Sequence, residues 1–168
     1  MLKVLLKNIG TLLSGDINNP VLDRDAVIID GSEIVSVGKE AELKKEDIET
    51  VIDINGATVA PGLIDSHCHV CVGDYTPRQF ATNFIEGELH DGVTTVISAG
   101  ECHYPGRPKD PAGTKALAIL TAKAYENLRP GGVKVIGGGL ILEKGLTESD
   151  FEEMAKEGVT HVGEIGLG

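Results

Sequence analysis

The chain has 168 residues, with 15 Lys and Arg against 26 Asp and Glu, so its formal net charge is −11 at pH 7. Charged residues (24%) and hydrophobic residues (41%) are balanced as in a globular protein, and the length allows one domain or two small ones. The acidic balance and the 4% of aromatic residues disfavour nucleic acids and anionic membranes as partners.

The N-terminal sequence lacks a sustained apolar region before a small-residue cleavage site, so we expect no signal peptide. Every apolar run falls short of the ~20 residues of a membrane helix. Three cysteines are an odd number and do not indicate a secreted disulfide framework. We therefore expect a cytoplasmic protein without membrane or nucleic-acid partners.

Residues 1–56 predict a small β module. Gly31 favours a hairpin between two of its strands, and Asn55-Gly56 favours a second hairpin, because these residues accept a positive φ. The charged stretch 40–49 is a candidate short helix. The expected strands are residues 2–6, 26–30, 34–37, 50–54 and 57–60.

Residues 57–168 alternate between strands and helices, a pattern typical of a parallel sheet with right-handed crossovers. Glycine followed by a β-branched run, as at Gly92, Gly132 and Gly158, indicates the end of a helix and the start of a buried strand. Helices are expected to begin near Thr76-Pro77, Gly113-Thr114 and Thr147, the second with an inner face of Leu117, Leu120, Ala124 and Leu128. The expected strands are residues 58–69, 93–99, 133–141 and 159–166.

His67 and His69 lie at the end of the first of these strands and share one face of it. Two imidazoles on one face at the carboxyl end of a parallel strand can bind one metal ion, although they could also be two polar loop residues. Asp65 shares that face and either supports a ligand or caps the strand end. Glu164 ends the fourth strand; inside a sheet its carboxylate needs a cation or a Lys or Arg partner.

The strings PGLIDSHCH and GVTTVISAGE resemble the amidohydrolase superfamily of metal-dependent (β/α)8-barrel hydrolases. Within this superfamily, the sequence resembles the enamidases, the branch that hydrolyses cyclic enamides. This narrower resemblance rests on four further strings: KNIGTLLSGD, PGRPKDPAGTKALA, ILEKGLTESDFEEMAKEGV and VGEIGLG. The resemblance implies an α/β fold: part of a small β-sandwich (residues 1–56), then the first four βα units of a TIM barrel (residues 57–168). A complete barrel needs ~250 residues, so we expect a truncated chain.

The same resemblance implies that His67 and His69 bind metal and that Glu164 bridges two divalent ions, Zn²⁺ and/or Fe²⁺, where many members use a carboxylated Lys. Two further His ligands and an Asp general base would come from later strands, so the 168 residues alone are expected to be inactive. The implied reaction is attack of metal-bound hydroxide on the C–N bond of a cyclic amide of the 6-oxo-tetrahydronicotinate type. A full-length protein is expected to be a homo-oligomer.

Several alternatives stay open. Arg78, His103 and Arg107 follow the first two strands and could contact a substrate, the arginines through its carboxylate, or could be ordinary loop residues. Cys68 and Cys71 form C-x-x-C, which could be a redox pair or could make a zinc site with Cys102 and His103. The substrate could instead be that of a dihydroorotase- or imidazolonepropionase-like enzyme. A non-catalytic half-barrel that assembles with a partner is the alternative from another class.

Overall fold

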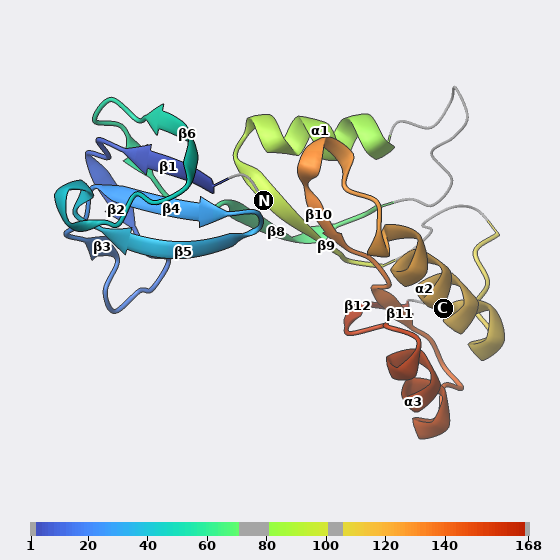
Figure 1. The fold of residues 1–168 in the computed structure, drawn as a ribbon. Helices are drawn as coiled ribbons and strands as arrows, with labels where there is room; N and C mark the ends of the chain where they lie inside the picture. Colours follow the sequence, from blue (N-terminus) through green and yellow to red (C-terminus); the bar gives the residue numbers. More distant parts are fainter. Residues whose placement is uncertain (1–2, 71–80, 101–105, 167–168) are drawn as a thin grey trace. The chain divides into compact units, whose positions relative to one another are not determined.

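The computed structural model describes residues 3–70, 81–100 and 106–166, and of residues 81–82 it describes only the backbone. The chain forms two compact units, Met1–Pro61 and Gly62–Gly168 (Figure 1). Among the described residues, none of the helices combines the length and the apolar character that crossing a membrane requires.

The first unit consists of two small sheets. Their strand orders are β5-β4-β1-β6 and β3-β2-β7. Leu5 and Ile28 are buried on the four-stranded sheet, and Leu12 and Val27 are buried in a second cluster. The strands are β1 (Lys3–Lys7), β2 (Thr11–Leu13), β3 (Val21–Leu22), β4 (Ala26–Asp30), β5 (Glu33–Gly38), β6 (Ile48–Asp53) and β7 (Thr58–Val59).

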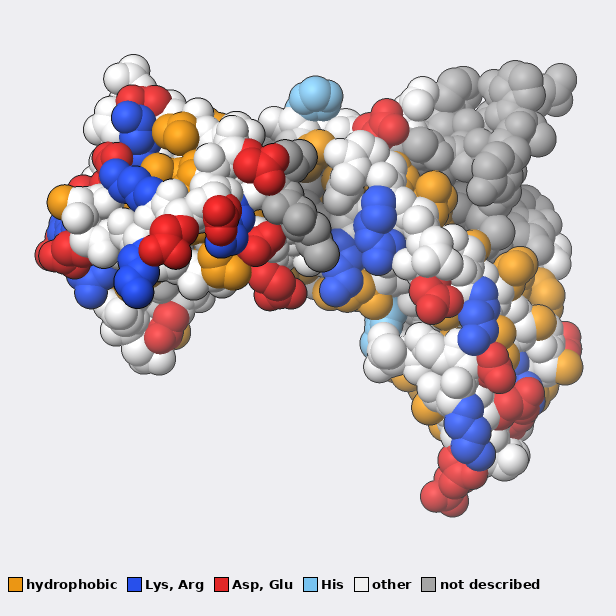
Figure 2. All heavy atoms as spheres, in the orientation of Figure 1, with side chains coloured by type: hydrophobic (Ala, Val, Ile, Leu, Met, Phe, Trp, Pro, Cys, Tyr) orange, Lys and Arg blue, Asp and Glu red, His pale blue; other side chains and the backbone are white. Residues whose placement is uncertain are grey.

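The surface of this unit mixes both signs of charge, as the interspersed red and blue side chains in Figure 2 show. Four lysines pair with carboxylates there at N–O distances of 2.5 to 4.0 Å. Because these pairs are exposed, each contributes little to stability, at most about 1 kcal/mol.

The hairpin at Gly31 is confirmed, since β4 and β5 pair antiparallel around it. The helix over residues 40–49 is wrong: only Glu40–Glu42 forms a 3-10 turn, and β6 begins at Ile48 because it pairs in parallel with β1. The hairpin at Asn55-Gly56 is also wrong. Both residues have the expected positive φ, but β6 pairs with β1 and β7 with β2, so the turn carries the chain between two sheets.

The second unit alternates strands and helices, which confirms the predicted α/β class. Parallel strands β10-β9-β8 form one sheet and parallel strands β11-β12 another. The elements are β8 (Leu63–Cys68), α1 (Ala81–His90), β9 (Val93–Ser98), α2 (Pro111–Glu126), a 3-10 turn (Pro130–Gly132), β10 (Lys134–Ile136), β11 (Leu140–Leu142), α3 (Glu148–Lys156) and β12 (Val162–Ile165).

The expected strand over residues 133–141 is broken at Gly137–Gly139. A side chain at Gly137 would meet the backbone carbonyl of Thr121 in α2, and one at Gly139 would overlap the carbonyl of Ser98 at the end of β9. These glycines therefore let helix and strand backbones approach closely. The break allows β10 to pair with β9 and β11 to pair with β12, so one stretch of chain links both sheets.

The inner face of α2 differs from the prediction. The buried residues are Thr114, Ala118, Thr121 and Tyr125, whereas Leu120 is 52% exposed. Ala118 and Thr121 are small because the backbone of α2 at these residues lies against Gly138 and Gly137, where leucines would not fit. Close packing thus overrides the apolar pattern. The predicted helix start at Thr147 is confirmed: a capping box between Thr147 and Asp150 opens α3, and Met154 is buried beneath that helix.

Candidate metal centre

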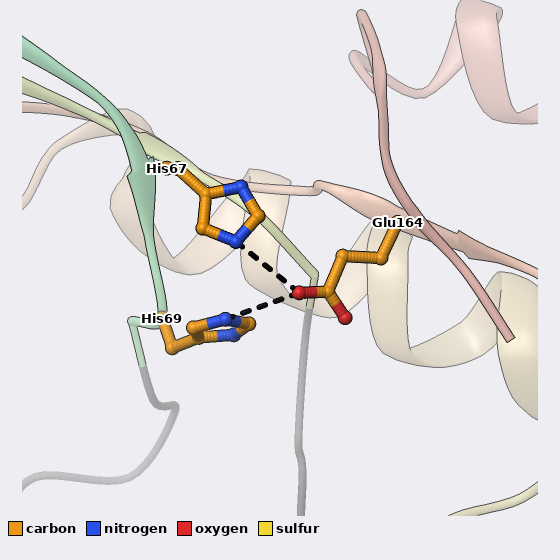
Figure 3. Close-up of side chains that lie close together, drawn as sticks. All are labelled: His67, His69 and Glu164. Carbon is orange, nitrogen blue, oxygen red and sulfur yellow. Dashed lines mark ion pairs between the residues drawn. The ribbon is translucent and has the colours of Figure 1, made fainter. Parts of the chain in front are cut away.

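His67 and His69, at the end of β8, point at one carboxylate oxygen on β12. The Nε2 atoms of His67 and His69 lie 3.3 and 3.2 Å from Oε1 of Glu164 (Figure 3). The two imidazole rings are nearly perpendicular, with centroids 5.3 Å apart. Three residues separated by almost a hundred positions in the sequence therefore converge on a single point.

The ring of His69 is oriented from behind by the backbone. Its Nδ1 lies 3.4 Å from the carbonyl oxygen of Gly100, two residues after the end of β9. A carbonyl oxygen can only accept a hydrogen bond, so this contact needs a proton on Nδ1. The other ring nitrogen, Nε2, then faces the side on which Glu164 lies and is the one available to a metal ion.

The donor set fits a divalent metal ion. One nitrogen from each histidine and one carboxylate oxygen lie within 4.8 Å of one another. Ligand atoms about 2.1 Å from a tetrahedral zinc ion are separated by roughly 3.4 Å, close to the observed N–O distances. The side chains are 62%, 43% and 25% exposed for His67, His69 and Glu164, so an ion could reach them.

Of the three predicted substrate-contacting residues, only Arg107 lies among the described residues. Arg107 pairs with Glu143, its Nη2 lying 2.5 Å from Oε1 of that carboxylate. Arg78 and His103 lie outside the described residues. Of the alternative cysteine site, only Cys68 is described; it is buried in the core cluster with Val70 and Val96, away from the histidine pair.

One polar residue at a strand end was missed in the sequence analysis. Glu143 directly follows β11 and is only 8% exposed, a position at which an acidic residue could have been recognised as a candidate. The Nε2 atom of His161 lies 2.7 Å from the carbonyl oxygen of Ser98 and links the segment before β12 to β9. That contact left no signal in the sequence.

Comparison with known proteins gives a relative that matches the whole chain. Enamidase from Eubacterium barkeri is 58% identical over 168 residues, which are 100% of this chain and 44% of the enamidase. Adenine deaminase 2 from Shouchella clausii (strain KSM-K16) is 32% identical over 83% of this chain and 24% of that protein. Imidazolonepropionase from Bacillus thuringiensis (strain Al Hakam) is 36% identical over 48% of this chain and 22% of that protein. No protein-family profile matches.

The crystal structure of enamidase, described as a member of the amidohydrolase superfamily, superposes with a TM-score of 0.86 over 99% of this chain and 43% of that one, at 56% identity. The chain thus spans less than half the length of this relative. The mixed α/β structure with its several sheets is consistent with a partial TIM barrel plus a β-sandwich. The chain is similar along its whole length to part of enamidase, a member of the amidohydrolase superfamily.

Proposed function

We propose that this chain contributes part of the active site of a metal-dependent hydrolase that cleaves a C–N bond in a cyclic amide. The observation that carries the proposal is the convergence of His67, His69 and Glu164 on one point at the ends of two strands. Two imidazole nitrogens and a carboxylate suit a borderline divalent ion such as Zn²⁺ or Fe²⁺. The similarity to enamidase supports the same chemistry.

We propose that the site would hold two divalent ions, with His67, His69 and Glu164 among their ligands. Such ions would supply Lewis acidity toward a carbonyl oxygen and would make a water molecule more acidic. The protein residues would hold the ions and orient the ligands. The Gly100 carbonyl fixes the ring of His69, and the negative charge of Glu164 would balance part of the charge of the metal ions. The identity and the number of the metals stay predictions.

The proposed substrate is a cyclic enamide of the 6-oxo-tetrahydronicotinate type, because enamidase matches the whole chain at 58% identity. Imidazolonepropionase-like or dihydroorotase-like chemistry is less well supported, since imidazolonepropionase matches only 48% of the chain. Substrate contacts by Arg78 and His103 stay predictions. Arg107 would have to share its guanidinium between Glu143 and a substrate carboxylate. The cytoplasmic location and the homo-oligomeric state also stay predictions.

Zinc titration of the apo chain tests the metal site. We expect binding of at least one Zn²⁺, and a loss of affinity of about 10-fold or more in each of His67→Ala, His69→Ala and Glu164→Gln, because each removes one ligand. His90→Ala is the control, since His90 ends α1 and takes no part in the cluster. Equal zinc affinity in the wild type and the three ligand variants would refute the site.

The reaction is tested in a longer protein that contains these 168 residues together with the later ligands that the resemblance implies. We expect ammonia release from the cyclic enamide, and at least one metal lost per subunit in Glu164→Ala, measured by elemental analysis. Turnover of an imidazolone or a dihydroorotate instead would assign the alternative substrate. We expect no turnover by the 168 residues alone, and measurable turnover by them would contradict the proposed division of ligands.

A further inference from the structure

The pairing of β8 with β9 is irregular just before the histidines. Asp65 faces Val96 and Cys68 faces Ser98, so three steps along β8 correspond to two steps along β9. One residue between Asp65 and Cys68 is therefore extra. A bulge of this kind bends the strand and changes the direction of the side chains that follow it.

The carboxylate of Asp65 stabilises this irregular backbone. Its Oδ1 accepts a hydrogen bond of 2.9 Å from the backbone N–H of His67, two residues further along the chain. In a regular ladder that N–H would be directed to a neighbouring strand or to solvent. Asp side chains form such local bonds with the backbone two residues on, where they favour a turn over a continued strand.

The carboxylate thus acts on the backbone of a candidate ligand. His67 is 62% exposed, and its ring contacts Glu164 and His69, the other two candidate ligands. Apart from these contacts, the backbone geometry at its own amide sets where its Nε2 points. By contrast, His69 has the Gly100 carbonyl behind its ring.

We propose that Asp65 is a positioning residue, which holds the backbone of His67 so that its ring and that of His69 meet at one ion. This inference rests on the proposed metal site. The effective group is the oxygen acceptor, whereas the negative charge is not required. Asp65→Asn keeps an acceptor oxygen in the same place, and Asp65→Ala removes it.

Zinc affinity, measured by competition with a chelator, is the first readout. We expect Asp65→Ala to weaken zinc binding about 10- to 100-fold, the usual effect of removing a residue that orients a ligand. Asp65→Asn should stay within about 3-fold of the wild type. Asp16→Ala is the matched control, because Asp16 makes the same bond, 2.9 Å from its Oδ1 to the N–H two residues on, in a turn of the first unit.

The second readout needs no metal. The nuclear Overhauser contact between the rings of His67 and His69 in the apo chain should be lost in Asp65→Ala and kept in Asp65→Asn and Asp16→Ala. Far-UV circular dichroism verifies that each variant is folded.

A ring contact retained in a folded Asp65→Ala, or equal losses in Asp65→Asn and Asp65→Ala, would overturn the positioning role. If Asp65→Ala does not fold, the comparison of Asp65→Asn with the wild type decides. If the wild type binds no zinc, the proposed metal site fails, and the ring contact alone decides whether Asp65 positions His67.

Discussion

Arg107 and Glu143 form an ion pair from which solvent is largely excluded, with side chains 12% and 6% exposed. Arg107 lies before α2 and Glu143 directly after β11, so the pair ties the segment preceding the helix to the end of a strand. Glu143 also lies against Gly166, where any side chain would overlap its carboxylate. Removing the cation would leave the Glu143 carboxylate buried and unpaired. This would strongly destabilise the folded protein, because little water can reach the carboxylate in place of the lost contact.

Arg107→Met should therefore lower the free energy of unfolding by about 3–5 kcal/mol. The double variant Arg107→Met/Glu143→Leu should recover most of that loss, because it leaves no unpaired charge. Lys123→Met is the control: it breaks a pair with Glu157 whose side chains are about half exposed, and should cost at most about 1 kcal/mol. Urea unfolding measures all four proteins. A wild-type midpoint for Arg107→Met would mean that the pair is not structural and would leave Arg107 available to a substrate.

The sequence was a better guide to which residues could bind a metal than to which side chains would contact one another. Strand periodicity and the family resemblance selected His67, His69 and Glu164, and the structure brings these three together. The same reasoning identified Arg107 as a charged residue near the site. It could not show that Glu143, 36 positions away, would pair with Arg107, because that contact depends on how the segment before α2 packs against the end of β11.

The first turn of α3 contains a small network of charges and hydrogen bonds. Oδ2 of Asp150 accepts bonds from the N–H and the hydroxyl of Thr147, at 2.8 and 2.7 Å. Its Oδ1 lies 2.8 Å from Nζ of Lys115 on α2. The hydrogen bond from Lys115, followed by those from Thr147, lowers the pKa of Asp150 from 3.8 to about 2. The network thus joins two helices through one carboxylate.

A lowered carboxyl pKa adds stability that is fully present above the unfolded-state pKa and is lost on acidification. For Asp150 the loss should fall between about pH 4 and pH 2. Asp150→Asn should be less stable than the wild type at pH 6 and equally stable near pH 2, as measured by urea unfolding across this range. Glu152→Gln, which removes an α3 carboxylate outside the network, should show no such pH-dependent difference. Parallel acid curves for wild type and Asp150→Asn would contradict the assignment.

Element type was more predictable than element boundaries. The alternation of strands and helices follows from hydrophobic runs and glycine signals that act locally. The break at Gly137–Gly139 and the extra residue at Gly163 on β12 depend on close approach of other backbones. A side chain at Gly163 would overlap the carbonyl of Ala99, a contact between strands that local propensity does not encode.

At the scale of the whole molecule, the sheet strands that carry the candidate ligands have free sides. Among the described residues, β8 pairs only with β9, and β12 pairs only with β11. Apolar side chains on these strands are exposed: Ile64 by 63%, Val162 by 48% and Ile165 by 73%. Unpaired strand edges with apolar side chains readily pair with other chains.

The purified 168-residue chain should therefore associate as its concentration rises, as sedimentation velocity would show. Ile165→Lys should reduce this association, since lysine on an edge strand opposes further pairing. Ile17→Lys is the control, because Ile17 is 90% exposed but lies outside any strand. If the association is open-ended, and Ile165→Lys weakens it while Ile17→Lys does not, the result supports the enzyme hypothesis. In that case other parts of an enzyme would cover these strand edges. A closed dimer of fixed mass, formed without metal, would instead favour the non-catalytic half-barrel. In such a dimer the two copies would pair each other's strand edges, and no other polypeptide would be needed to cover them.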